Sequence, residues 1–550
     1  MDQPLPDQSP QSPGLAATRR AFFGLGALGL AGLGAPGHAL AVGGFTHGVA
    51  SGEPGPDRVL LWTRFAAAQE TVLHWDLAED MAFTRIVAQG QCAASPATDG
   101  CVRAWATGLQ PGQWYFYRFS AASGAQSVTG RTKTLPVGKV PSFRIAVFSC
   151  SNYGFGWFNA YGHAAEADQF DLAVHLGDYF YEYRRGGYPS TKQGLADRLG
   201  PVSEAVTLAD YRERFATYRS DPDLQRLHQL YPMITIWDDH ELANDTWRDG
   251  AENHQPNEGD WAVRKAASER AYREWLPVSD ADYAAYEVGD LATLARLETR
   301  HLARDKPYQL NAIFDAAAPG RGASALDAFR DGVWRDPRRE LLGTAQQNWL
   351  AGTLKASTRA RKPWQVLVQQ IVMGELAMPR NLAEGMAADS ADWLKKRITT
   401  AVEASREGLP WNMDAWDGYP AARDRVLKAA LEADANLLVL AGDSHNAWAF
   451  DLDRKGKRVG VEMAGHSVTS PGAEGTLRWR KPEVLAADFV ARNAQLKWCD
   501  TSQRGYLALE LTPHSATGEW RFMASVRQKG RALAAVKRMT VLAGARKFLA

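Results

Sequence analysis

Short apolar runs recur between residues 45 and 136, with turn-forming residues between them. The run at 59–62 (VLLW) is followed by TVLHWDLA, RIVAQGQ, VRAWATGL and WYFYRFSA, the last ending at residue 121. Closely spaced short strands of this kind predict an all-β, immunoglobulin-like sandwich as an accessory domain over residues 45–136. The stretch TKTLPVGKVP at 132–141 is expected to link it to the rest of the chain.

From residue 143 the pattern changes to buried strands that alternate with helices. Strands are predicted at 144–148, 172–176, 231–237, 365–368, 436–440, 506–511 and 520–526. Apolar residues four apart predict helices at 261–276 and at 338–355, the second beginning at Asp336 and Pro337. The periodicity is broken over 277–330, a stretch that could form a lid over a site. This alternation predicts an α/β domain over residues 143–550.

The first 41 residues predict an export signal. Thr18-Arg19-Arg20-Ala21-Phe22-Phe23 is a twin-arginine pattern, Gly24 to Ala35 is apolar, and Ala39-Leu40-Ala41 is a cleavage site. A membrane anchor is the alternative, but the run is short and rich in glycine, and no later segment has transmembrane length. We therefore expect the twin-arginine machinery as a partner and a periplasmic or secreted location. That route carries proteins already folded, often around a cofactor.

Composition changes this picture little. With 550 residues, length allows two to four domains, or one large domain with an accessory one. The 63 basic and 62 acidic residues give a net charge of +1, so no global field favours nucleic acid or an anionic membrane. In an oxidising compartment Cys92 and Cys101 either close a hairpin disulfide or stay free, and Cys499 has no evident role.

Four predicted strands end in polar residues capable of binding metals. The blocks are FSCSN, HLGDYFYEY, WDDHE and LAGDSHN. Any one of them alone is more often a turn or a helix cap. Because strands of an α/β sheet present their carboxyl ends at one edge, the four together predict one metal site. Its candidate residues are Cys150, Asp178, Tyr181, Asp239, His240, Asp443 and His445.

These blocks resemble the metallophosphoesterases, and most closely the alkaline phosphatase D (PhoD-like) family. The resemblance also rests on FTHGVASGEPGPDRVLLWTR, DAWDGYPAARDRV and GVEMAGHSVTS, and runs from about residue 45 to about residue 511. It implies a β-sandwich core flanked by helices (α/β/β/α), in an exported phosphoester hydrolase that acts through a metal-bound hydroxide. Alkaline phosphatase activity is expected, with phosphodiesterase or phospholipase D-like cleavage as the alternative.

The resemblance implies iron and calcium. Thiolate, phenolate, carboxylate and imidazole from Cys150, Tyr181, Asp178 and His445 suit Fe³⁺, and Asp178 would also bridge to the second site and take part in catalysis. The oxygens of Asp239 and Asp443 favour one or two Ca²⁺, with Asn244 or Asp245 as a further ligand. His240 would bind phosphate or assist the leaving group, or would orient a neighbouring ligand.

Two other functions compete with this one. In the first, Cys150 is a nucleophile with His240 or His445 as its base, but SNYGFGWF lacks the arginine-rich phosphate loop that such enzymes use. In the second, the chain is an exported metal-binding or attachment protein whose metals are structural. Two residues depart from the family pattern: Glu298 stands where aspartate is expected, and His466 either lines the pocket or packs.

Overall fold

The computed structural model describes residues 44–316 and 322–549. The predicted signal peptide, at residues 1–41, lies outside the described residues. None of the described helices is both long and apolar enough to cross a membrane.

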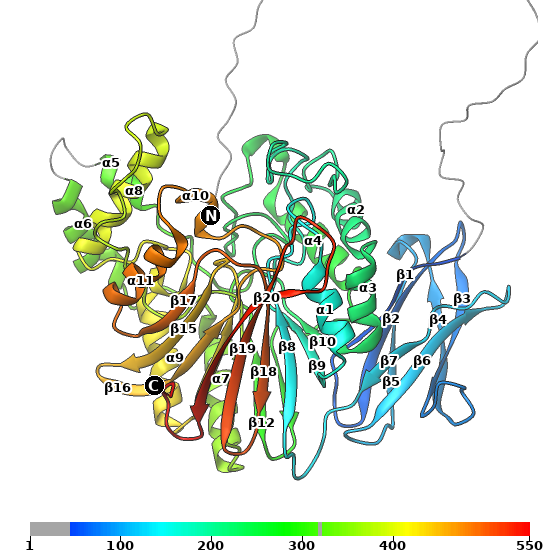
Figure 1. Cartoon of the computed structure of the whole chain (residues 1–550). Coiled ribbons are helices and arrows are strands. Elements are labelled where there is room, and N and C mark those ends of the chain that lie inside the picture. Colours follow the sequence, from blue (N-terminus) through cyan, green and yellow to red (C-terminus); the bar gives the residue numbers. More distant parts are fainter. Residues whose placement is uncertain (1–43, 317–321, 550) are drawn as a thin grey trace, which may run out of the picture.

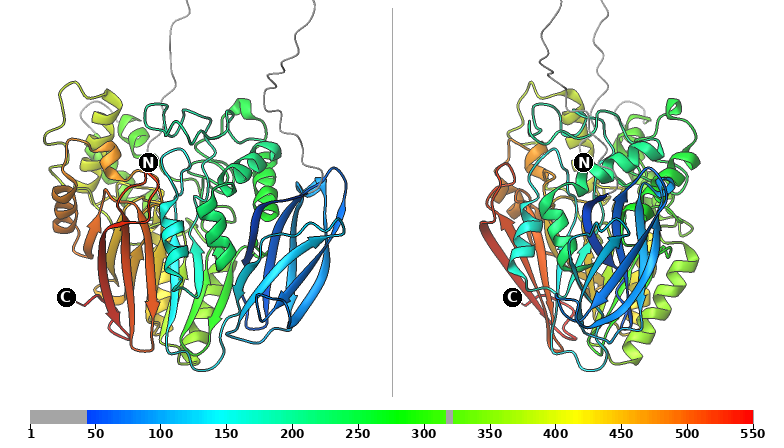
Figure 2. Two further views of the ribbon diagram at one scale, coloured as in Figure 1. Left: turned by 45° about the vertical axis from the view of Figure 1, so that its right-hand side comes forward. Right: turned by 90° about the vertical axis from the view of Figure 1, so that its right-hand side faces the viewer.

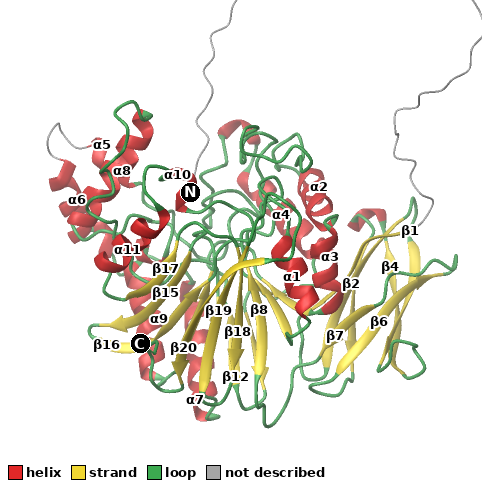
Figure 3. Ribbon diagram, viewed as in Figure 1, coloured by secondary structure: helices red, strands yellow, loops and turns green. Residues whose placement is uncertain are grey.

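Two large sheets pack face to face in the centre of the molecule (Figure 3). One has the order β20-β19-β18-β8-β9-β10-β1-β2-β5 and the other β11-β12-β13-β14-β16-β15-β17. The part of the chain after residue 142 gives the first sheet six strands. They are β8 (Phe143–Phe148), β9 (Leu172–His175), β10 (Pro232–Thr235), β18 (Gly505–Leu511), β19 (Ser515–Met523) and β20 (Leu533–Leu542). The second contains β11 (Ala284–Val288), β12 (Ala292–Arg296), β13 (Trp364–Val368), β14 (Leu437–Ala441), β15 (Ala447–Arg454), β16 (Lys457–Ala464) and β17 (Leu496–Asp500).

Helices cover the outer face of each sheet (Figure 1). The first sheet is covered by α1 (Asn159–Ala167), α2 (Leu208–Arg219), α3 (Pro222–Leu230) and α4 (Trp261–Trp275). The second is covered by α7 (Gly343–Arg359), α8 (Asp392–Arg406), α9 (Pro420–Glu432) and α11 (Pro482–Arg492). The shorter helices are α5 (Leu310–Ala316), α6 (Gly322–Asp331) and α10 (Ala473–Thr476). The predicted α/β/β/α architecture is confirmed.

Burial on both faces explains why the central strands are apolar throughout. In β14, Leu438 and Leu440 face the space between the sheets, whereas Leu437 and Val439 face the outer helices. A strand covered on both sides has no polar face, so its sequence forms a continuous apolar run.

The N-terminal strands form the predicted all-β sandwich, and three of them also extend the first of the two large sheets. β3 (Thr71–Ala78), β4 (Ile86–Ala94), β6 (Trp114–Ala121) and β7 (Gly130–Lys133) form a four-stranded sheet, which faces β1 (Gly44–Gly52), β2 (Arg58–Ala66) and β5 (Cys101–Thr107). β1 pairs in parallel with β10, with Ser51 opposite Pro232. Figure 2 shows this sandwich, in blue, flanking the larger core.

Three details differ from the predictions. Helix α7 begins at Gly343 rather than near Arg338, because Asp336 accepts the Arg338 N–H in a turn and Gly343 takes a left-handed φ of 73°. Several strands were not predicted, among them β11, β12, β15, β17 and β20. Cys92 and Cys101 are both free thiols in this structure, so of the two alternatives left open by the sequence the structure has no disulfide between them.

Candidate metal centre

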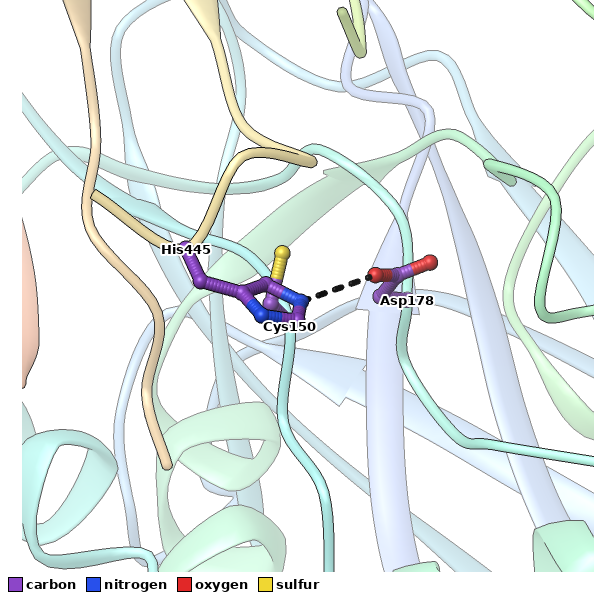
Figure 4. Close-up of side chains that lie close together, drawn as sticks. All are labelled: Cys150, Asp178 and His445. Carbon is purple, nitrogen blue, oxygen red and sulfur yellow. Dashed lines mark ion pairs between the residues drawn. The ribbon is translucent and has the colours of Figure 1, made fainter. Parts of the chain in front are cut away.

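The predicted metal-binding side chains follow directly from the ends of the central strands. Cys150 follows β8, Asp178 follows β9, and His445 follows β14 (Figure 4). All three have positive φ angles, of 58°, 53° and 61° respectively. Residues other than glycine adopt this conformation at a cost of about 1–3 kcal/mol each, so the surrounding loops must hold them in place.

Two glycines allow these loops to approach each other closely. Gly177 has a φ of 99°, and a Cβ there would lie 2.4 Å from the Asp238 side chain. A Cβ at Gly442 would lie 2.6 Å from that of Ser149. The strand ends therefore meet at a spacing that only glycine permits at these two positions.

The first group of side chains combines sulfur, nitrogen and oxygen atoms. Ligand atoms of Cys150, Asp178 and His445 all lie within 4.8 Å of one another. The Tyr181 hydroxyl donates to Asp178 Oδ2 at 3.0 Å and lies 3.0 Å from His445 Nε2. His445 Nδ1 lies 2.9 Å from the Pro471 carbonyl oxygen, which directs Nε2 toward the group. The four predicted iron ligands are therefore brought together.

The second group consists of carboxylates. Asp238, Asp239 and Asp443 form one cluster, and Asp239, Asp245 and Asp414 form another. His240 lies within the same distance limit of Asp178 and Asp239. Arg300 and Arg304 supply the two guanidinium groups paired with this cluster, so its carboxylates outnumber them.

Arg300 lies among these carboxylates and is fully buried. Its Nε donates to Asp238 Oδ1 at 2.5 Å, its Nη1 to Asp414 Oδ2 at 2.6 Å, and its Nη2 to Asp443 Oδ1 at 3.2 Å. Arg304 pairs with Asp414. One oxygen on each of Asp178, Asp239 and Asp443 nevertheless makes no hydrogen bond within the described chain.

Unpaired buried carboxylate oxygens are costly unless a cation meets them. Burial raises the pKa values of Cys150, Asp178 and Asp443 well above their usual range and lowers that of His445. Burial also acts to raise the pKa of Asp239, but the charges of Arg300 and His240 lower it. The residues present fit a centre whose cations would keep these donors ionised.

Buried glutamates fix the side chains around the centre. Glu182 Oε2 lies 2.7 Å from His240 Nδ1, and Glu182 Oε1 accepts the Asn244 N–H at 2.8 Å. Burial opposes a charge on His240, yet Glu182 and Asp239 raise its pKa well above the usual value. Glu182 thus holds the imidazole in one orientation.

Glu241 holds the backbone of the two strand-end loops. It accepts N–H groups from Asp178, Tyr179 and Asp238, at 3.2, 2.5 and 2.7 Å. Asp178 and Asp238 belong to different strand ends, so one side chain joins both.

The structure also shows where Asn244, Asp245 and Glu298 lie, whose roles the sequence left undecided. Asp245 lies in the carboxylate group, whereas the Asn244 amide donates to Glu252 at 3.1 Å. Glu298 accepts the N–H groups of Arg300 and His301 at 2.7 Å each, so it shapes the loop that carries Arg300.

His466 and Cys499 lie apart from the centre. His466 is buried and lies against Phe522, with ring centroids 4.5 Å apart and the ring planes tilted by 42°, so it packs rather than lining the pocket. Cys499 is buried in β17 and donates to the Ala486 carbonyl.

Sequence reasoning missed Arg300, Asp414, Glu182 and Glu241. Asp414, Glu182 and Glu241 stand inside blocks already singled out, DAWDGYPAARDRV, HLGDYFYEY and WDDHE, so their place in these blocks was the available indication. Arg300, on a loop after β12, stands two residues after Glu298 in the stretch LETR, which had been compared with the family pattern only for its glutamate.

Comparison with known proteins identifies the family. A family model described as PhoD-like phosphatase matches residues 145–520, and one for the PhoD-like phosphatase N-terminal domain matches residues 35–136. Alkaline phosphatase D of Bacillus subtilis (strain 168) is 33% identical over 515 residues, which cover 89% of this chain and 79% of that protein. A solved structure of PhoD superposes with a TM-score of 0.75 and 30% identity, covering 94% of this chain and 93% of that one. The chain therefore belongs to the PhoD-like phosphatases, a family of phosphoester hydrolases.

Proposed function

We propose that the chain is an exported phosphatase that depends on iron and calcium. The observation that carries the proposal is the set of buried oxygens on Asp178, Asp239 and Asp443 that accept no hydrogen bond within the described chain. They lie among the side chains of a cysteine, a tyrosine and a histidine. A buried ion pair that only stabilises the fold would not require these three additional donors. The metals, when bound, neutralise phosphate charge and make a water molecule acidic enough to supply the nucleophile.

The donor chemistry supports two kinds of ion. Cys150, Asp178, Tyr181 and His445 supply the sulfur, oxygen and nitrogen donors that suit Fe³⁺. Asp239 and Asp443 supply oxygen only, which favours one or two Ca²⁺ ions. Between the two alternatives for a further ligand, we favour Asp245, since its carboxylate points into the group.

The chain's own residues position the substrate. His240, held by Glu182, presents its other ring nitrogen toward the carboxylates and would donate a hydrogen bond to the phosphate or leaving-group oxygen. Arg300 keeps Asp238, Asp414 and Asp443 together, so the oxygens that would face the metal are fixed before the substrate arrives.

Phosphodiester cleavage is the second candidate. A cavity of about 90 Å³ borders His445, and another of about 180 Å³ borders Asn244, Asp245 and Asp414. A diester has a substituent on either side of its phosphorus, and these cavities would give each substituent a place.

The two competing functions are less well supported. Burial raises the pKa of the Cys150 thiol, so without a metal it is a poor nucleophile. A purely structural metal site would be closed by protein ligands, whereas here cavities reach the centre on two sides.

Phosphate release from 4-nitrophenyl phosphate, and 4-nitrophenol release from its bis-ester, test the proposal. We expect Asp178→Asn to lower kcat by about 100-fold or more while circular dichroism stays unchanged. Activity that survives this substitution, or wild-type protein that hydrolyses neither ester, would refute the proposal.

Export through the twin-arginine machinery is proposed from the leader. Replacing Arg19 and Arg20 with lysine should leave the full-length precursor in the cytoplasm, whereas the wild-type chain should be exported and cut after Ala41. Export of the lysine variant at the wild-type rate would contradict this route.

A further inference from the structure

An apolar cavity lies beside the centre and is lined by residues of α8, α10, α11 and the loop that carries His445. Figure 1 shows where these three helices lie. Its volume is about 90 Å³, which leaves room for several water-sized groups. The apolar part of its wall comes from Met378, Ile398, Trp411, Trp448, Leu477 and Phe489. Most of these side chains belong to the buried core over the second sheet, so the cavity is a hollow in that core.

One end of this cavity is formed by the centre itself. Ser444, His445 and Asn446 line it together with Pro471. His445 Nε2 lies 3.0 Å from the Tyr181 hydroxyl and 3.8 Å from Asp178 Oδ2. A phosphate held at these side chains would therefore lie at the mouth of the cavity, and a group esterified to it would enter.

The walls of the cavity are fixed before a ligand arrives. The Trp448 indole N–H donates to Ser444 Oγ at 2.8 Å, which ties an aromatic wall to the His445 loop. The Asn446 carbonyl oxygen accepts from Ser444, and its side-chain Oδ1 accepts the Ala473 N–H at 3.0 Å. Trp411 is half-buried and packs on the same core.

The cavity has one lining side chain of each charge, Asp417 and Arg397. Asp417 lines it, accepts the Leu376 N–H at 2.9 Å and is buried. Burial raises its pKa to about 7, so it carries a negative charge at alkaline pH. A charged substituent in the cavity would lose its hydration against a wall that is mostly apolar and whose two charged side chains have opposite signs.

We infer that this cavity is a specificity subsite that binds an uncharged aliphatic or aromatic substituent of the phosphoester, with Ile398 as a size-determining residue. The inference rests on the proposed phosphoester hydrolysis and names the substrate class. Ile398 lies on α8, is buried, and lines this cavity but not the polar one beside Asp245.

The test measures binding of alkylphosphonates, which the enzyme cannot cleave, to the metal-loaded enzyme by isothermal titration calorimetry. From ethyl- to butylphosphonate, affinity should rise about fourfold for each methylene buried. 3-Hydroxypropylphosphonate, which matches butylphosphonate in length but ends in a hydroxyl, should bind no better than ethylphosphonate.

Variants of α8 separate the cavity from the phosphate site. Ile398→Phe should fill the cavity, remove the gain with chain length, and weaken ethylphosphonate far less than butylphosphonate. Thr399→Ala, on the exposed face of the same helix, should behave as wild type. Equal affinity of the wild-type enzyme for ethyl-, butyl- and hexylphosphonate would overturn the inference. Equal weakening of all three by Ile398→Phe would do the same.

If Ile398→Phe does not fold, the comparison of butyl- with 3-hydroxypropylphosphonate on wild-type enzyme decides the question. Phosphate release from ethyl and butyl phosphate is measured alongside. Binding that depends on chain length without any phosphate release supports the subsite and refutes the proposed phosphatase activity. Phosphate release without any dependence on chain length refutes the subsite and supports the activity.

Discussion

Removing the Glu241 side chain is expected to destabilise the protein and to empty the metal centre together. Glu241 is buried and accepts the backbone N–H groups of Asp178, Tyr179 and Asp238. Glu241→Ala leaves all three donors without their acceptor. Asp178 has a left-handed backbone, so it also loses a bond that holds this conformation.

The expected loss of unfolding free energy follows from the number of N–H donors that lose their acceptor. Each buried donor left without a partner costs about 1–3 kcal/mol, and three would cost several times that if water stayed out. Because water entering the vacated space replaces part of the lost bonding, we expect about 3 kcal/mol. That is a large share of the roughly 5–15 kcal/mol by which a typical domain is stable. Glu241→Gln keeps one acceptor oxygen but turns an N–H₂ group toward the remaining donors, and should cost nearly as much.

Urea unfolding after chelation, followed by tryptophan fluorescence, measures the free energy without contributions from bound metal. Mass spectrometry of unchelated protein measures the metal. Glu213→Ala, an exposed glutamate on α2, is the control and should match wild type in both. Wild-type stability and full metal content in Glu241→Ala would refute the role assigned to this side chain.

Three further outcomes are expected. His240→Gln should lower kcat about 100-fold and leave iron and calcium content unchanged, and loss of calcium would instead make His240 a ligand. Cys150→Ser should reduce bound iron and shift its visible absorption while calcium stays, whereas unchanged iron would remove Cys150 from the ligand set. Asp417→Asn tests the effect of burial on the Asp417 carboxyl. Burial raises the pKa of this group in the folded protein to about 7. The stability that comes from binding this proton is therefore full below about pH 4 and is lost as pH rises through 7. Wild type should therefore lose up to about 4 kcal/mol more than Asp417→Asn between pH 4 and pH 9, and equal losses in urea midpoint experiments would contradict the shift.

The central strands and the residues that follow them could be predicted because local pattern determines both. A continuous apolar run identifies a strand buried on both faces, and polar residues after several such strands must meet at one edge. Cys150, Asp178 and His445 were found in this way, and the structure brings them within 4.8 Å.

Long-range pairing explains what was missed. Arg300 reaches Asp238, Asp414 and Asp443 across 62, 114 and 143 positions of the chain, so no local pattern reveals these partners. The parallel pairing of β1 with β10 is equally remote in sequence, which is why the N-terminal sandwich was expected as an accessory domain rather than as an extension of the catalytic sheet.

The helix boundary at Gly343 depended on a detail of backbone geometry. Asp336 followed by Pro337 is a common helix start, but here the Asp336 carboxylate accepts the Arg338 N–H and also pairs with the Arg338 side chain, closing a turn instead. The helix begins only after the left-handed Gly343.

Metal content tests the central claim most directly. Protein exported through its own leader and purified without chelators would be analysed by plasma mass spectrometry. We expect iron near one per chain, with calcium at one or two. Zinc in both sites would contradict the ligand assignment at Cys150 and Asp443, and an active preparation without stoichiometric metal would contradict the whole account.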